Sequence, residues 1–278
     1  MSLRVEQLGS AEADSVHSFL AREPLKNLHL LAMLQERARV SPGDSPVEVH
    51  AAFGADQITA LVLVEPGRGV VLPSAIGSAS DFFAIGEHLA SRVHLRRSVG
   101  EKAAVEALVK ALGKAAITSS KLHRLYWVSP DQLGPYLQPG LRLATESDLP
   151  TLLALAERAL AETLGSAPTA PQLSALERQT LENVRLQRSR IFELEGQLVL
   201  KVEVSFRCSL GAELEGLYTA PDCRRRGYAT LALGHLSRQL LASLPRLTMR
   251  AADPLAGVAR KVGYQSGPGA QLLVTDWE

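Results

Sequence analysis

A strand, a basic turn with a glycine and an amphipathic helix follow one another within residues 213–241, and this succession constrains the fold most. Residues 213–219 alternate between apolar and polar side chains as a half-buried strand does, and Pro221 and Asp222 break that strand. The next apolar residues recur at helical spacing: Leu231, Leu233, Leu236, Leu240 and Leu241. The pattern predicts an α/β unit in which a strand passes through a tight turn into a helix.

The turn has the composition of an anion-binding site. Gly227 stands where the turn meets the helix, and a helix start offers unpaired backbone N–H groups and the positive end of the helix dipole. Gly227 and Ala229 are small enough for a ligand to approach the backbone, and the arginines at 224–226 add positive charge. The alternative is a solvated basic turn or a nucleic-acid patch. An isolated arginine run, however, does not predict the glycine register or the flanking elements.

Two motifs resemble those of the GNAT acetyltransferases. Arg224-x-x-Gly227-x-Ala229 matches that family's (Gln/Arg)-x-x-Gly-x-(Gly/Ala) signature. Residues 253–264, which end in Gly-Tyr, resemble the family's next helix. The resemblance implies acetyl-CoA as co-substrate, an amine as acceptor and no metal ion. It also implies that the turn holds the pyrophosphate of acetyl-CoA.

The predicted elements run through one order twice. Strands are expected near residues 3–7, 47–53, 58–65, 68–73, 93–99 and 122–128, and helices near 10–22, 25–39, 81–91 and 100–112. The order restarts with strands near 141–145, 190–194, 197–206, 213–219, 246–251 and 270–277, and helices near 147–164, 172–189, 228–241 and 254–262. This is an α/β pattern with mixed sheets, and it resembles two GNAT-like domains, each a mixed central sheet flanked by helices. We expect a degenerate N-terminal domain at 1–130, a linker at 131–140 and a C-terminal GNAT domain at 141–278.

The first half lacks the signature spacing. Its nearest candidate for an anion-binding turn, residues 96–100, leads into a helix and resembles the uncharacterised domain that precedes GNAT domains in many bacterial tandem proteins. This turn lacks the second small residue, so a structural repeat without cofactor is favoured over an anion site. Leu28, Leu30, Leu31 and Leu34 are more apolar residues than one narrow helix stripe needs. They suggest a buried contact with the second half.

The resemblance also implies which residues bind acetyl-CoA. The strand end would pair with the pantetheine arm, and an N–H near Tyr218 would polarise the thioester carbonyl. The turn and the helix start would bind the pyrophosphate. The implied set is Leu217, Tyr218, Thr219, Arg224, Arg225, Arg226, Gly227, Tyr228, Ala229 and Thr230.

Glu215 is the best candidate for the general base. Strand alternation places it on the same face as Leu217 and opposite Tyr218, and GNAT enzymes with a strand glutamate have it near this position. It could take a proton from an ammonium, directly or through water. The alternatives are a solvated glutamate, as Glu213 is expected to be, and Glu203 on the neighbouring strand as the base.

The second motif departs from the family. Many members have a tyrosine four residues before its glycine as general acid, and here that position is Ala259; counting from Asp253, which stands for the usual asparagine, gives Arg260 instead. Tyr264 is expected in the core. Two functions therefore stay open: an acetyl-CoA-dependent N-acetyltransferase, or a non-catalytic acyl-CoA-binding sensor or scaffold.

Composition limits the remaining possibilities. The 278 residues carry a formal net charge of +1, so no overall field points to nucleic acid or to a membrane surface. No apolar run reaches the roughly 18 residues that a membrane-spanning helix needs. The two cysteines, Cys208 and Cys223, form no disulfide framework or metal motif, so we expect a cytoplasmic location. The acceptor and the oligomeric state cannot be predicted from the sequence.

Overall fold

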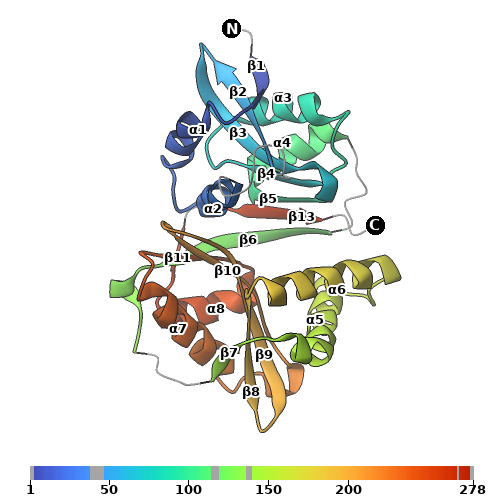
Figure 1. Ribbon diagram of the computed structural model, residues 1–278, viewed down its shortest axis with the longest axis vertical. Helices are drawn as coiled ribbons and strands as arrows, with labels where there is room; N and C mark the ends of the chain where they lie inside the picture. The colour runs from blue at the N-terminus through green and yellow to red at the C-terminus, as the bar shows by residue number, and fades with distance from the viewer. Residues whose placement is uncertain (1–2, 38–46, 114–118, 136–139, 268, 276–278) are drawn as a thin grey trace. The chain divides into compact units, whose positions relative to one another are not determined.

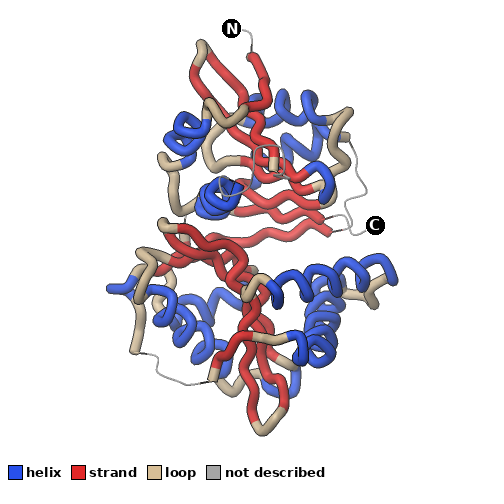
Figure 2. The backbone as a smooth tube through the Cα atoms, viewed as in Figure 1, coloured by secondary structure: helices blue, strands red, loops and turns tan. Residues whose placement is uncertain are grey.

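The structure is a computed structural model that describes residues 3–37, 47–113, 119–135, 140–267 and 269–275. Its contacts divide the chain into two compact units. Unit 1 consists of residues 1–125 and the segment that carries the last strand, and unit 2 consists of residues 126–267. In both units the strands lie between helices (Figure 2). Within the described ranges, no helix has the length and apolar character to cross a membrane.

Unit 1 is built on a mixed sheet with strand order β1-β2-β3-β4-β5-β13-β6 (Figure 1). Neighbouring strands are antiparallel except β4 and β5, which are parallel. Its elements are β1 (Arg4–Leu8), α1 (Ala13–Leu20), α2 (Leu28–Arg37), β2 (Glu48–Gly54), β3 (Gln57–Glu65), β4 (Val70–Pro73), α3 (Ala79–Leu89), β5 (Arg97–Glu101), α4 (Lys102–Leu112), the first part of β6 (Ser119–Val128) and β13 (Gln271–Thr275).

Helices α3 and α4 supply much of the core of unit 1. Their buried side chains, among them Phe82, Ile85 and Leu108, meet the valine-rich strands β3 and β4. Leu28 and Leu30 of α2 are fully buried, Leu31 is nearly so and Leu34 is half-buried. The expected contact between α2 and the second half stays a prediction.

Unit 2 has the strand order β6-β11-β10-β9-β8-β7, with the short β12 on β6. Strands β10 and β11 are parallel, whereas the pairs β7–β8, β8–β9 and β9–β10 are antiparallel. Its elements after β6 are β7 (Leu141–Leu143), α5 (Leu149–Leu164), α6 (Ala170–Arg185), β8 (Ser189–Leu194), β9 (Gln197–Cys208), β10 (Gly211–Thr219), α7 (Tyr228–Leu241), β11 (Leu247–Ala251), α8 (Asp253–Val262) and β12 (Gln265–Ser266).

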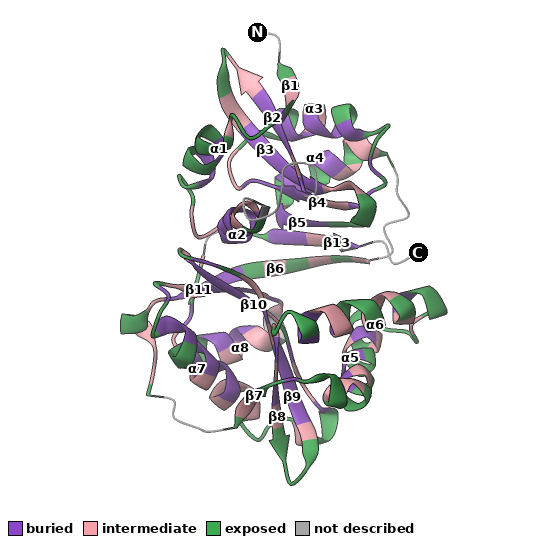
Figure 3. Ribbon diagram, viewed as in Figure 1, coloured by how far each residue is buried: buried purple, intermediate pink, exposed green. Residues whose placement is uncertain are grey.

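The two faces of the unit 2 sheet differ in chemistry. Side chains of β9, β10 and β11 pack with α7 and α8 into an apolar core that also takes in Tyr126 and Val128 of β6. The other face meets α5 and α6 through a small apolar cluster that includes Leu152 and Val184. Helix α6 also buries polar residues, namely Gln172, Thr180 and Asn183. Most of the remaining α6 ribbon is exposed or half-buried (Figure 3). The sheet therefore has one apolar face and one partly polar face.

The α/β class with mixed sheets and the order of elements are confirmed, with boundaries shifted by a few residues at most ends. The last strand is expected in the sheet of the second half, but it lies in the sheet of unit 1. It pairs with β5 and β6 inside unit 1, while residues 126–128 of β6 belong to unit 2. Alternating side chains identify a strand but do not identify its partners. Residues 136–139 of the expected linker lie outside the described residues.

Candidate functional site

Strand β10 carries a β-bulge directly after Glu215. Glu215 and Tyr218 are three residues apart on β10, but their partners on β9 are only two apart. Gly216 lies in the bulge with φ +62°, a conformation that favours glycine. The extra residue puts Glu215 and Tyr218 on the face that meets α5 and α6, while Leu217 is buried in the core with α7 and α8. The prediction that Tyr218 and Glu215 point to opposite faces is therefore wrong.

Strands β10 and β11 pair only where they begin. The register joins Ala212 to Leu247 and Leu214 to Met249, and in the described residues no pairing between these strands extends further. Strand β10 continues to Thr219 as a partner of β9. The last part of β10 is therefore paired along one edge, and its other edge can receive an extended ligand as an added strand.

The turn after β10 leads into a helix start that, among the described residues, no side chain caps. Gly227 is the N-cap of α7 with φ +84°, and a Cβ built there would meet open space. The first hydrogen bond inside α7 runs from the Leu231 N–H to the Gly227 carbonyl at 3.1 Å, so the N–H groups of residues 228–230 precede it. Arg225 and Arg226 are exposed beside these groups. Backbone N–H groups ahead of the first helical hydrogen bond, a helix dipole and two arginines together suit an anion.

Other residues of unit 2 bind the guanidinium of Arg224. It donates to both carboxylate oxygens of Glu162 in α5, each at 2.8 Å, and its Nε donates to the Thr219 carbonyl at 3.0 Å. It also lies 5.1 Å from the ring centroid of Tyr218, whose hydroxyl donates to Glu162 at 2.7 Å. Arg224, which the signature nominates as a cofactor contact, thus has its charge balanced by Glu162.

The side chains at two other predicted cofactor positions pack against other side chains of the protein. Leu217 is 8% exposed in the apolar core, and the ring of Tyr228 lies 5.6 Å from that of Phe192. These residues can serve a ligand through their backbone groups. Thr219, Ala229 and Thr230 are half-buried beside them.

The two glutamates considered as base are in different surroundings. Glu215 is half-buried and accepts a hydrogen bond from Ser205 Oγ at 3.1 Å. Glu203, directly opposite it on β9, is bound by Lys201 at 2.7 Å and by Asn183 at 2.9 Å. An ammonium that is itself 8% exposed therefore balances the charge of Glu203. This makes Glu203 the weaker candidate for the base.

Glu213 is not the solvated residue that alternation predicts. It is 1% exposed and forms an ion pair with Arg250 of β11. Its neighbour across the parallel ladder is Thr248. The error arises because both edges of β10 are paired at this position, so a charged side chain there needs a buried partner.

Helix α8 does not bring a tyrosine or another acid to the position that the second motif nominates. Ala259 is fully buried within the apolar core. Tyr264 is 2% exposed, as expected for a core residue; burial raises the pKa of its hydroxyl, which shares a 2.8 Å hydrogen bond with Ser237. Arg260 is exposed, and the side chain of Asp253 lies outside what the structure describes.

Unit 1 has a helix start in the corresponding place, because α3 follows β4 as α7 follows β10. Here a side-chain cap satisfies one of the first helical N–H groups. The Asp81 N–H donates to Ser78 Oγ at 3.2 Å, and the Ser78 N–H donates to the Asp81 carboxylate at 2.9 Å, which makes a capping box. The preceding Ala75 N–H donates to Asn27 Oδ1 at 2.8 Å. An anion at this helix start would meet the Asp81 carboxylate.

The nearest candidate turn of the first half, which the sequence already disfavoured as an anion site, is part of a strand. Residues 97–101 form β5, which pairs with β13, and a Cβ on Gly100 would lie 2.7 Å from Pro73 Cγ. The useful signal was the Ser78-x-x-Asp81 spacing, which predicts a capped helix start. It was available in the sequence and would have identified the filled counterpart of the α7 start.

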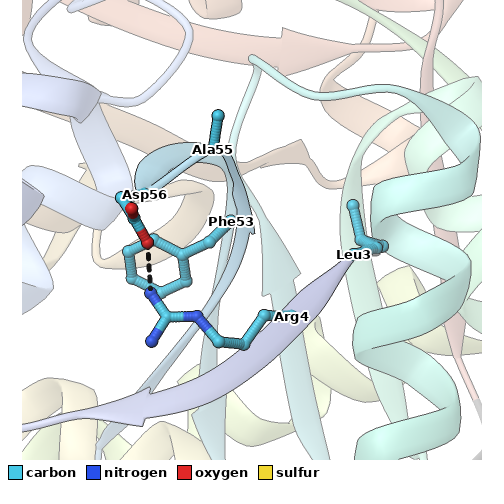
Figure 4. A pocket seen from close by; sticks show the side chains of 5 residues that line it. All are labelled: Leu3, Arg4, Phe53, Ala55 and Asp56. Atoms are coloured by element: carbon cyan, nitrogen blue, oxygen red, sulfur yellow. Dashed lines mark ion pairs between the residues drawn. The ribbon is translucent and has the colours of Figure 1, made fainter. Parts of the chain in front are cut away.

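A shallow recess of unit 1 lies by the turn between β2 and β3 (Figure 4). Arg4 crosses it, with its guanidinium 4.7 Å from the Phe53 ring centroid and 3.5 Å from the Asp56 carboxylate. Leu3 and Ala55 complete its lining. Among the residues that the structure describes, no three His, Cys, Asp or Glu side chains are grouped to hold a metal ion.

No protein-family profile and no curated protein sequence matches the chain. Solved structures match along its whole length. A GNAT-family acetyltransferase from Colwellia psychrerythraea is 13% identical, with 98% of this chain and 100% of that chain covered and a TM-score of 0.57. A GCN5-related N-acetyltransferase from Sphaerobacter thermophilus is 12% identical over 99% and 95% of the two chains, with a TM-score of 0.57. A tandem GNAT protein from the clavulanic acid biosynthesis pathway is 12% identical over 100% and 99%, with a TM-score of 0.51. The chain therefore has a tandem GNAT-type fold, as the sequence predicted.

Proposed function

We propose that unit 2 binds acetyl-CoA and transfers its acetyl group to an amine. The observation that carries the proposal is the start of α7: an N-cap glycine with open space around it, N–H groups ahead of the first helical hydrogen bond, and exposed Arg225 and Arg226. This arrangement fits a diphosphate. It follows directly on a strand whose second edge is open to an extended ligand such as the pantetheine arm.

The residues of this chain would divide the transfer among them. Backbone groups of β10 after the bulge would orient the thioester, and an N–H near Tyr218 would stabilise the developing oxyanion. Glu215 would take a proton from the acceptor ammonium, and the neutral nitrogen would attack the thioester carbon. A C–N bond forms, the C–S bond breaks, and CoA leaves as the thiolate, which takes up the second proton that the new amide nitrogen loses. The lone pair that the nitrogen donates is thus balanced by the pair that departs on sulfur.

Binding without transfer is the second candidate, and one observation favours it. Ala259, at the position of the family's acid, is buried in the core and brings no proton donor to the leaving sulfur. A thiolate leaves tolerably without such a donor, so catalysis does not require one. In a non-catalytic protein the α7 start would still bind acyl-CoA, and Glu215 would have no role in turnover.

Acetyl transfer to a panel of amines, measured beside acetyl-CoA affinity, separates the two. For an enzyme, Glu215→Gln should lower kcat/KM by roughly 10²-fold and leave acetyl-CoA affinity nearly unchanged. Glu146→Gln, at an exposed glutamate paired with Arg185, is the control and should change neither. Binding without transfer to any amine would favour the second candidate, and absence of binding would overturn both.

A further inference from the structure

We infer that Glu162 is a positioning residue for the phosphate-binding turn and acts through Arg224; this inference rests on the proposed function. Arg224 is the first residue of the turn signature, yet its side chain points to α5. It joins the turn to two elements at once, to β10 through the Thr219 carbonyl and to α5 through Glu162. We call these contacts, together with Tyr218, the Arg224 clamp.

The clamp has the geometry of a strong exposed pair. Both carboxylate oxygens of Glu162 accept from Arg224 Nη2 at 2.8 Å, and the Tyr218 hydroxyl adds a third hydrogen bond at 2.7 Å. The side chains of Arg224 and Glu162 are 41% and 47% exposed, so solvent screens the pair. The hydrogen bonds from Tyr218 and Arg224 lower the pKa of Glu162, which keeps the carboxylate charged at neutral pH. Burial and Glu162 raise the pKa of Tyr218 to about 12, so its hydroxyl remains a donor.

The turn needs such an anchor because its own residues pack little. Residues 224–227 are all exposed, and Arg225 and Gly227 both adopt left-handed backbone conformations, with φ +64° and +84°. A non-glycine residue pays a conformational cost in that region. Holding the turn before the ligand arrives removes part of the ordering cost of binding. Because Glu162 balances the charge of Arg224, the positive charge that would bind the diphosphate comes from Arg225, Arg226 and the α7 start.

Amide hydrogen exchange of the full-length protein without ligand tests the clamp itself. Glu162→Ala and Arg224→Ala should each speed exchange of the amides of residues 223 and 224, which donate to the Ala220 and Pro221 carbonyls, by roughly 5-fold. The double variant should not exceed Arg224→Ala, which already removes the Glu162 contact together with the Thr219 contact. Glu162→Gln keeps the Tyr218 hydrogen bond and should give a smaller effect. Glu146→Gln breaks another exposed Arg–Glu pair of unit 2, with a 2.8 Å contact to Arg185, and should leave the turn unchanged. Unchanged exchange in Glu162→Ala would overturn the clamp.

Acetyl-CoA titration then tests the positioning role. Glu162→Ala should weaken affinity by roughly 5-fold, and adding it to Arg224→Ala should cause no further loss. Unchanged or tighter binding in Glu162→Ala would overturn the inference, since tighter binding means that Glu162 competes with the diphosphate for Arg224. If the wild type does not bind acetyl-CoA, the proposed function fails, and the exchange experiment still decides whether Glu162 orders the turn.

Discussion

The starts of helices α3 and α7 occupy corresponding places in the two units and differ in what satisfies their N–H groups. At α3, Ser78 and Asp81 bond each other's backbone N–H groups, and Asp81 brings a negative charge. At α7, the N-cap is Gly227, no side chain of the described residues caps the helix, and Arg225 and Arg226 are exposed nearby. We propose that the same fold element is closed in unit 1 and open to an anion in unit 2.

We infer from this comparison that a GNAT-like helix start is not by itself a binding site. The α3 cap satisfies one of the donors that a ligand would use and brings a carboxylate beside the others, and such a cap stabilises a helix by about 1 kcal/mol. An uncapped start gives up that stabilisation and keeps its donors for a ligand. The difference between the units therefore lies in a few side chains and in the sign of one charge.

The largest expected effect is on the folding of unit 2, and it tests which part of the chain unit 2 needs in order to form the open start. A fragment that begins at residue 141 lacks Tyr126 and Val128, which are fully buried in the core of unit 2. Loss of each large buried side chain costs about 2–5 kcal/mol, against about 5–15 kcal/mol for a whole domain. We expect this fragment to be insoluble or to lack cooperative thermal unfolding, whereas one that begins at residue 119 should do better. A soluble, cooperatively folded fragment from residue 141 would contradict this core assignment.

Ala259→Tyr tests whether α8 faces the site or the core. Because Ala259 is fully buried, the larger ring should overpack the core and destabilise the protein by about 1–3 kcal/mol. Chemical denaturation measures this effect, and Arg260→Tyr, at an exposed neighbour, is the control. A stable Ala259→Tyr protein with faster transfer would show instead that position 259 reaches the leaving sulfur.

Thr230→Asp gives α7 the acidic third residue that α3 has. The carboxylate should repel the diphosphate and weaken acetyl-CoA affinity by roughly 10-fold. It should also stabilise the helix by about 0.3–1 kcal/mol, because a negative charge favours a helix N-terminus. Thr230→Asn keeps the size without the charge and should weaken binding far less. An open start predicts that Thr230→Asp binds acetyl-CoA more weakly in calorimetry and unfolds at a higher temperature. Equal affinities for the Asp and Asn variants would contradict it.

Ser78→Ala opens the capped start of unit 1. Loss of the cap should destabilise the protein by about 1 kcal/mol, measured by thermal unfolding. It should not create a second acetyl-CoA site, because Asp81 and Asn27 remain in place. Binding of a second ligand by this variant would mean that the cap alone separates the two units.

The sequence predicted the fold through local patterns and missed what depends on distant partners. The glycine register at Gly227 and the flanking alternation were enough for the strand, the turn and the helix. Gly216 inside a strand was a readable cue for the bulge that reorients Tyr218. The Arg224–Glu162 pair joins residues 62 apart, and the partners of β13 lie in the first half, so neither follows from local spacing.

Acetyl-CoA titration of the full-length protein and of Gly227→Glu tests most directly that the α7 start is the open one. We predict one site per chain and a loss of at least ~2 kcal/mol of binding free energy in Gly227→Glu, because the new carboxylate meets the diphosphate. Gly227→Ala carries the same left-handed backbone strain, with φ +84°, and should bind much more tightly than the Glu variant. Unchanged affinity in Gly227→Glu, or two sites per chain in the wild type, would contradict the account.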